Sequence, residues 1–231
     1  MNTKTIENLQ HIVRDNYESI ASDFNETRKK PLWPALADIL RSVQDGQSAL
    51  DVGCGNGRLL EAMTIMNIEY LGIDQSRELI ALAQRNYPTY SFGVGDILSI
   101  HNVTEKKYDW VTSIAVLHHI PGEEHRLKAL RELKERMNDD GRIILTVWNL
   151  WRHKKYKNLI WKFAWQKIIG KHEMDFGDIL FSWKNQDDVV NNLRYYHAFT
   201  VRDLKKLVQK SGLKIERLII DDYNYYLVLK K

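Results

Sequence analysis

The sequence has a single cysteine, Cys54, only four prolines and no long apolar run. One cysteine cannot form an internal disulfide, and its scarcity fits a reducing compartment. No apolar stretch approaches the roughly 20 residues that a membrane-spanning helix needs, and the charged N-terminal stretch lacks the apolar core of a signal peptide. The eight histidines and one cysteine form no cluster with metal-ligand spacing, so no metal site is predicted. We therefore expect a cytoplasmic protein without membrane contact.

The chain also has little net charge, +4 at neutral pH, but its basic residues are unevenly distributed. Residues 151–171 contain seven Lys or Arg and five Trp, Tyr or Phe, but no Asp or Glu. Basic residues neutralise phosphates, and aromatic rings stack on unstacked bases, which favours an RNA interface. The apolar spacing also fits an amphipathic helix with a solvated basic face, and a helix on a membrane surface is a third interpretation.

Short apolar segments alternate with amphipathic segments through the middle of the chain. The pattern predicts strands at 48–52, 69–73, 90–94, 109–115 and 142–148, and helices at 57–66, 76–86 and 123–137. Strands that alternate with helices indicate a parallel sheet. In such a sheet, ligands bind outside the carboxyl ends of the strands.

The two ends of the chain add further elements to a single domain of residues 1–231. Residues 1–46 form a helical cap: one helix is predicted from Ile6 to Phe24 and a second from Pro31 to about Asp45, both across the ligand edge of the sheet. Residues 150–190 interrupt the alternation and form a basic, Trp-rich insertion, with a loop at 185–188. A helix at 200–210, capped by Thr200 and Asp203, and an antiparallel hairpin of 213–220 and 223–229 complete the expected domain.

A glycine-rich turn follows the first predicted strand. Gly53, Gly55 and Gly57 alternate with Cys54 and Asn56 directly after Asp51. Glycine tolerates the positive φ of such a turn and lets a ligand approach the backbone closely. The spacing differs from the G-x-G-x-x-G of dinucleotide-binding folds.

Acidic residues follow the next two strands. Asp74 comes about twenty residues after the glycine turn, where a carboxylate accepts hydrogen bonds from ribose hydroxyls in nucleotide-binding folds. Asp96 and Ile97 follow the third strand. Together with the turn, these residues predict a ligand site at the carboxyl ends of the strands.

Two histidines follow the fourth strand. His118 is predicted at the substrate entrance, where it would line the site or bind the acceptor base; a purely structural histidine is the alternative. Because neighbouring residues on a strand point in opposite directions, His119 is expected to face the core.

These motifs, in this order, resemble those of the class I S-adenosylmethionine (SAM) methyltransferases. The resemblance implies a Rossmann-like, seven-stranded, mostly parallel sheet with one antiparallel strand and helices on both faces. It implies that the turn containing Gly53, Cys54, Gly55, Asn56 and Gly57 faces the amino-acid part of SAM, with Asp51 orienting the turn. Gln75 would join Asp74 at the ribose, and Asp96 would accept a hydrogen bond from the adenine amino group, with Ile97 against the ring. Ala115 would lie under the sulfonium. The product would be S-adenosylhomocysteine.

Other stretches resemble a narrower family, the tRNA wobble-uridine carboxymethyl methyltransferases, which convert 5-carboxymethyluridine to its methyl ester. The similarity extends over nearly the whole chain; its more specific elements are Thr27-Arg28, Trp33-Pro34 and Tyr195-Tyr196-His197. The resemblance implies a tRNA substrate and, as in eukaryotic members, a small zinc-binding activator subunit. The stretch at 151–171 has no counterpart that we can match.

This narrower resemblance also implies roles for residues outside the cofactor motifs. Tyr17 would belong to the cofactor site, and Arg28 would hold the substrate carboxylate, unless it pairs with the carboxylate of the cofactor or forms a structural ion pair. Tyr196 and His197 would contact the base, or pack the insertion against the sheet. A small-molecule O- or N-methyltransferase with 150–190 as a lid, and a SAM-binding module without activity, are the alternatives.

Overall fold

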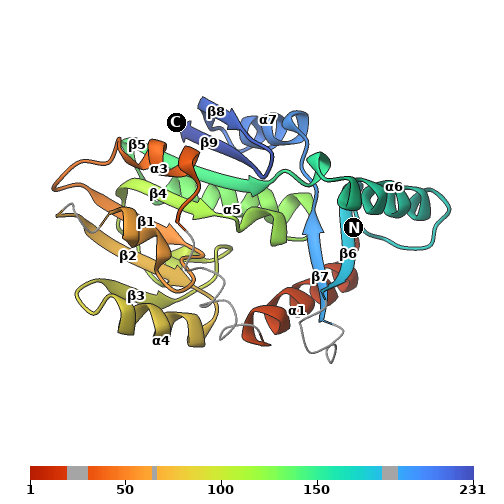
Figure 1. Cartoon of the computed structure of the whole chain (residues 1–231), viewed down its shortest axis with the longest axis horizontal. Helices are drawn as coiled ribbons and strands as arrows, with labels where there is room; N and C mark the ends of the chain where they lie inside the picture. The colour runs from red at the N-terminus through yellow and green to blue at the C-terminus, as the bar shows by residue number, and fades with distance from the viewer. Residues whose placement is uncertain (20–30, 64–66, 184–191) are drawn as a thin grey trace.

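A seven-stranded sheet forms the centre of the computed structural model, which describes residues 1–19, 31–63, 67–183 and 192–231 (Figure 1). The order of the strands is β3-β2-β1-β4-β5-β9-β8. Their bounds are β1 Ser48–Val52, β2 Glu69–Asp74, β3 Ser91–Val94, β4 Tyr108–Ile114, β5 Met137–Trp148, β8 Lys214–Ile220 and β9 Asn224–Lys230. Strands β1 to β5 pair in parallel, and β9 is antiparallel to both β5 and β8. The predicted sheet with one reversed strand is confirmed.

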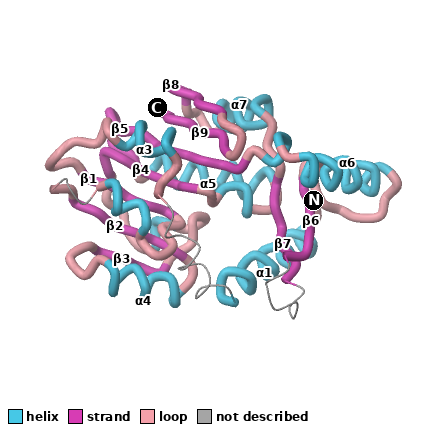
Figure 2. The backbone as a smooth tube through the Cα atoms, viewed as in Figure 1, coloured by secondary structure: helices cyan, strands magenta, loops and turns pink. Residues whose placement is uncertain are grey.

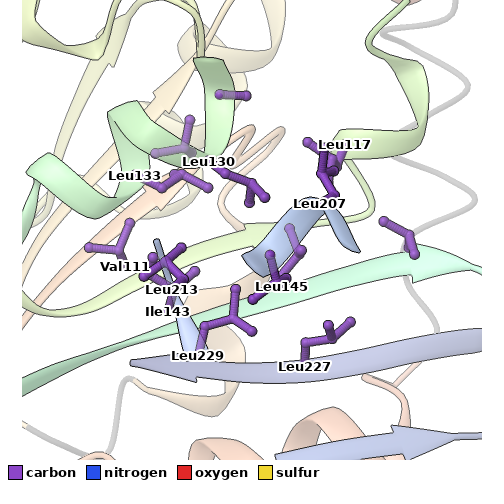
Figure 3. Packing of buried hydrophobic residues seen from close by; sticks show 14 of the residues in the cluster. Val111, Leu117, Leu130, Leu133, Ile143, Leu145, Leu207, Leu213, Leu227 and Leu229 are labelled. Atoms are coloured by element: carbon purple, nitrogen blue, oxygen red, sulfur yellow. The ribbon is translucent and has the colours of Figure 1, made fainter. Parts of the chain in front are cut away.

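Helices cover both faces of this sheet, as expected for a parallel arrangement (Figure 2). On β5, Ile143 and Leu145 face a core that includes residues of α5 (Glu123–Glu135) and α7 (Val201–Lys210), which Figure 3 shows. Ile144 faces the other core, which includes α3 (Pro34–Leu40). This alternation buries both sides of each central strand. Burial of each large apolar side chain stabilises the folded state by about 1.5–3 kcal/mol.

A second sheet of two strands lies beside the carboxyl ends of the main strands (Figure 1). It pairs β6 (Asp178–Trp183) with β7 (Asn192–His197) in antiparallel fashion. Helix α6 (Lys154–Ile168) and helix α1 (Thr3–Ser19) pack against it. The insertion predicted at 150–190 thus includes α6 and β6. Its strand β6 pairs with β7, which lies after residue 190, and this pairing was not predicted from the sequence.

Several element boundaries differ from the prediction. In place of a helix over 57–66, the structure has a short 3-10 helix, η1 (Arg58–Ala62), and residues 64–66 lie outside the described part. Residues 138–141, which the prediction leaves between the helix at 123–137 and the strand at 142–148, lie within β5. The pairing with β4 is irregular there, since Tyr108 pairs with Met137 but Trp110 pairs with Arg142. The first helix is described only to Ser19, and the loop predicted at 185–188 is also outside the described residues.

Shorter or peripheral elements complete the described structure. Helix α4 (Arg77–Asn86) begins after Ser76, whose hydroxyl accepts a hydrogen bond from Leu79 N. Helix α7 has the capping box predicted for Thr200 and Asp203. The remaining 3-10 helices are η2 (Ile100–Asn102), η3 (Leu117–His119) and η4 (Leu150–Arg152).

Candidate cofactor and substrate site

A cavity of about 220 Å³ lies at the carboxyl ends of β1, β2 and β4. The strand order reverses between β1 and β4, and open α/β sheets bind ligands at such a reversal. Among the predicted cofactor residues whose side chains the structure describes, the cavity walls include all but Gly57: Asp51, Gly53, Cys54, Gly55, Asn56, Asp74, Gln75, Asp96, Ile97 and Ala115. The sequence-predicted motifs are therefore brought together around one space.

The loop after β1 is fixed by its backbone. The N–H groups of Gly53 and Cys54 both donate to the carbonyl oxygen of Ile73 on β2, at 2.7 and 3.1 Å. Gly53 has a φ of +81°, and a Cβ atom there would lie 2.2 Å from Cγ2 of Val116. Only glycine therefore fits this position. Gly57 instead begins η1 and packs against Tyr87, outside the cavity.

The carboxylate of Asp74 connects this loop to the end of β2. One oxygen accepts a hydrogen bond from Gly55 N and the other from Ser76 N, both at 2.9 Å. Burial raises the pKa of this carboxyl, while the backbone N–H groups act in the opposite direction. Each carboxylate oxygen has two acceptor positions, so the group can still accept from two ligand hydroxyls. This donor and acceptor chemistry fits a ribose.

Asp51 lies deeper, at the end of β1. It accepts hydrogen bonds from Thr112 Oγ1 at 2.6 Å and from Tyr70 Oη at 2.9 Å. Burial nevertheless raises its pKa from 3.8 to about 6. The side chain thus borders the cavity and is fixed by the neighbouring strands, consistent with a role in supporting the turn.

The other end of the cavity combines a carboxylate with apolar groups. Asp96 follows β3, is exposed, and accepts a hydrogen bond from Leu98 N at 2.8 Å. Ile97 and Leu98 line the cavity beside it. A hydrogen-bond acceptor next to an apolar surface fits a planar heterocycle with an exocyclic amino group, such as adenine.

Ala115 follows β4 and lines the cavity on that side. Its φ is +59°, a conformation that no other non-glycine residue adopts in the described ranges. Its N–H donates to the backbone and side-chain oxygens of Thr146, at 3.1 and 2.9 Å. Backbone strain of this kind is typical of functional sites.

The two histidines after β4 lie opposite to the predicted orientation. β4 ends at Ile114, and residues 117–119 form η3, so the alternation of a strand does not apply to them. His119 lines the cavity. His118 is fully buried, with its ring 5.1 Å from that of Trp148 and its Nδ1 accepting from Trp148 N at 3.4 Å. His119, not His118, therefore faces the ligand space.

Tyr196 and His197 are also placed away from the cavity. Tyr196 is buried in a stack of rings, with centroids 4.9 Å from Trp148 and 5.3 Å from Phe181. His197 Nδ1 lies 2.7 Å from an Asp178 carboxylate oxygen, and burial lowers the pKa of the imidazole despite this carboxylate. The predicted alternative, packing of the insertion, describes both side chains here.

Several residues that line the cavity were not predicted from the sequence. The helical pattern at the N-terminus predicted an element across the ligand edge, but not that Gln10, Val13 and Arg14 of α1 line the cavity. Trp33, quoted only as part of a motif, lines it too. Of the other predicted residues, Arg28 lies outside the described part, and so does the side chain of Tyr17.

No group of three or more His, Cys, Asp and Glu side chains within the described ranges is placed to hold a metal ion. None of the helices in those ranges combines the length and apolar character that crossing a membrane requires.

Comparisons with known proteins point in one direction. Residues 8–218 match the family model described as "Methyltransferase domain". A tRNA (carboxymethyluridine(34)-5-O)-methyltransferase of Schizosaccharomyces pombe is 28% identical, over 98% of this chain and 99% of the relative. A protein of the same name from Saccharomyces cerevisiae is 34% identical over a match that covers 62% of this chain and 50% of that relative. A solved SAM-dependent methyltransferase from Methanosarcina mazei is 19% identical, with a TM-score of 0.70 over 87% of this chain and 99% of the other.

Proposed function

This chain belongs to the methyltransferase domain family as an S-adenosylmethionine-dependent enzyme, and we propose that its methyl acceptor is the carboxylate of 5-carboxymethyluridine at the tRNA wobble position. The observation that carries this proposal is the match to the S. pombe enzyme of that name, which extends over almost the full length of both chains. The specific elements Trp33-Pro34 and Tyr195-Tyr196-His197 support it, and Trp33 lines the cavity.

The proposed reaction does not require a general base from the protein. When bound, SAM supplies a methyl carbon attached to a positively charged sulfur, which keeps the electron pair when the methyl group leaves. A carboxylic acid with an ordinary pKa near 4 is ionised at neutral pH, so the acceptor needs no general base. The protein must exclude competing water and hold the acceptor oxygen about 3 Å from the methyl carbon, in line with the sulfur.

We propose the following roles for the donor side of the cavity. Asp74 and Gln75 bind the ribose, and Asp96 with Ile97 binds the adenine. The turn of Gly53, Cys54, Gly55 and Asn56 receives the amino-acid part, supported from behind by Asp51. Ala115 lies beside the reacting sulfur. Each of these residues lines the cavity, and we also assign Tyr17 to this site by resemblance.

On the acceptor side, the substrate carboxylate needs a cation that holds it without preventing attack. We propose Arg28 for this role by resemblance, because a guanidinium can bind a carboxylate through two parallel hydrogen bonds. Among the described residues, Arg14 of α1 also borders the cavity, and His119 lies on its wall. We propose that these two side chains orient the base next to its carboxymethyl group.

Incubation with labelled SAM and bulk tRNA, followed by nucleoside mass spectrometry, tests the proposal. Label in the methyl ester of carboxymethyluridine is the expected result. The assay is run with and without a small zinc-binding activator subunit, which we propose as a partner by resemblance. SAM binding without label in tRNA in either arm would refute the proposed acceptor and favour a small-molecule substrate.

Arg28→Ala separates the two roles of that arginine. If it holds the substrate, the variant keeps its SAM affinity and loses methyl transfer to carboxymethyluridine. Loss of SAM affinity would instead place Arg28 at the carboxylate of the cofactor.

A further inference from the structure

Helix α6 presents an unusual outward face. Trp161, Trp165 and Ile168 are 64%, 62% and 65% exposed. They are spaced by four and three residues and so lie along one line of the helix. The opposite face of α6, with Ile160, packs against β6 and β7. The exposed tryptophans are therefore not needed for the core of the insertion.

The same outward face is basic. Lys154, Lys157 and Lys162 are exposed, and neither these nor Lys171 form an ion pair within the described part of the chain. Between Trp151 and Lys171 there is no Asp or Glu. The only cation of this stretch with a carboxylate partner in that part is Arg152, which pairs with Asp222 at 2.7 Å. Positive charge and aromatic rings thus occur together on one surface.

The ring of Trp161 packs against Trp151, which is itself fixed by a hydrogen bond. Trp151 donates its Nε1–H to the carbonyl oxygen of Ala198 at 3.2 Å, and its ring packs edge to face with Trp161, 6.0 Å between centroids. Helix α6 follows β5 through η4, so it lies beyond the carboxyl end of the sheet, where the cavity is (Figure 1).

We propose that this face of α6, formed by Trp161, Trp165, Lys154, Lys157 and Lys162, is a docking surface for the acceptor RNA, with the lysines on phosphates and the two indoles on unpaired bases. This inference rests on the proposed function and names the surface by which the tRNA would be held. Residues four apart on a helix are separated by about 6 Å along the axis. Stacked bases are about 3.4 Å apart along a strand. The two indoles therefore match unstacked bases of a loop better than a continuous stack.

The distribution of side chains favours RNA over other occupants. A helix that lies in a membrane surface separates its basic face from its apolar face, whereas here the lysines flank the tryptophans on the same side. A purely apolar protein groove would leave the lysines without counter-charges. Phosphates beside exposed bases satisfy both groups at once.

Fluorescence anisotropy with two RNA probes tests the surface: an anticodon stem-loop and a fully paired duplex of the same length. The double variant Trp161→Ala, Trp165→Ala is expected to bind the stem-loop at least about 10-fold more weakly, because base stacking on an aromatic side chain contributes substantially. Its duplex binding should change little. The SAM affinity should be unchanged, since neither residue lines the cavity.

A charge variant tests the lysines separately. The slope of log K for RNA binding against log salt is negative. Replacing Lys154, Lys157 and Lys162 by Gln should make it shallower by about 2, the value for three single-stranded phosphate contacts. Matched controls are Ile220→Ala on β8, where the side chain is 50% exposed, and Lys205, Lys206 and Lys214 replaced by Gln. Both controls should retain the wild-type affinity and slope.

Three results would overturn the docking surface. The first is an unchanged stem-loop affinity in the tryptophan variant. The second is Trp-dependent binding to phosphatidylcholine–phosphatidylserine vesicles in place of RNA. The third is a dimer, seen by sedimentation, that the tryptophan variant dissociates. The labelling assay distinguishes the two proposals: Trp-dependent stem-loop binding without label in tRNA refutes only the acceptor, and label in tRNA with a fully active tryptophan variant refutes only the surface.

Discussion

The two ends of this molecule's ligand edge are stabilised in different ways. Around the cavity, backbone groups determine the geometry: the N–H groups of Gly53 and Gly55 are held by Ile73 and Asp74. In the insertion, side chains from distant segments determine it. Phe181, Tyr196 and Trp148 stack their rings, although they belong to β6, β7 and β5. Sites built from backbone are encoded locally, and sites built from distant side chains are not.

A polar network adds to this contrast. Tyr195 Oη donates to Asp178 at 2.8 Å, and Arg126 of α5 pairs with Asp175 at 3.3 Å. Together with His197, these side chains connect α5 to the β6–β7 hairpin in a buried region. Breaking such a network leaves buried charge without a partner and is costly. The β6–β7 sheet is therefore attached to α5 through side-chain interactions.

Removing the ring of Tyr196, which stacks between Trp148 and Phe181, should have the largest effect on the stability of the protein. Tyr196→Ala is expected to lower the free energy of unfolding by about 3–5 kcal/mol, the usual loss when a large buried aromatic side chain is truncated. SAM affinity, measured under conditions where the variant is folded, should change little, because Tyr196 does not line the cavity. Tyr196→Phe is the matched control and should retain most of the stability. Loss of SAM binding in the folded Ala variant would contradict the separation of the two regions.

On the cavity side, Asp74→Ala should have the largest effect on binding. The variant loses a charged acceptor for ligand hydroxyls and the hydrogen bonds that fix Gly55 and Ser76. Hydrogen bonds to charged groups contribute about 1.5–3 kcal/mol each, so calorimetry with S-adenosylhomocysteine should show at least about 100-fold weaker binding. A dissociation constant within a few-fold of wild type would remove Asp74 from the proposed cofactor site.

The buried carboxyl of Asp51 predicts a pH dependence. Its pKa rises from 3.8 to about 6 on folding, so between these values the folded protein holds a proton that the unfolded chain has lost. Its contribution to stability is therefore present at low pH and is lost as the pH rises through about 6. The full loss corresponds to about 3 kcal/mol.

Asp51→Asn cannot titrate and makes this contribution measurable. In urea denaturation, the difference in stability between wild type and the variant should shift by up to about 3 kcal/mol in favour of the variant as the pH rises from about 4 to 7. A difference that is independent of pH would show that Asp51 titrates normally in the folded protein.

Gln75→Ala should have the smallest effect. The side chain is exposed and borders the cavity beside Asp74. Loss of one uncharged hydrogen bond, about 0.5–1.5 kcal/mol, should weaken cofactor binding by about 3- to 10-fold without changing stability. A loss as large as that of Asp74→Ala would assign Gln75 a larger share of the ribose contact than proposed.

These differences also explain how far the sequence could predict the structure. Asp51, the glycine turn and Asp74 follow strands directly, and the rule that ligands bind at carboxyl ends places them together. The orientation of His118 and His119 depended on whether the strand continued past Ile114, which local pattern does not decide. The pairing of β6 with β7 and the inward direction of Arg14 depend on tertiary packing, so the sequence pattern could not reveal them.

Helix α1 belongs to both regions, because Val13 borders the cavity and also packs in the cluster that contains Tyr195 and Met174. Asn16, one turn further along the same helix, donates to the carbonyl oxygen of Leu193 on β7. Helix α1 is thus shared between the wall of the cavity and the packing surface of β7. By thermodynamic reciprocity, if the packing of β7 on α1 changes the affinity of the cavity for its ligand, the bound ligand changes the stability of that packing by the same free energy.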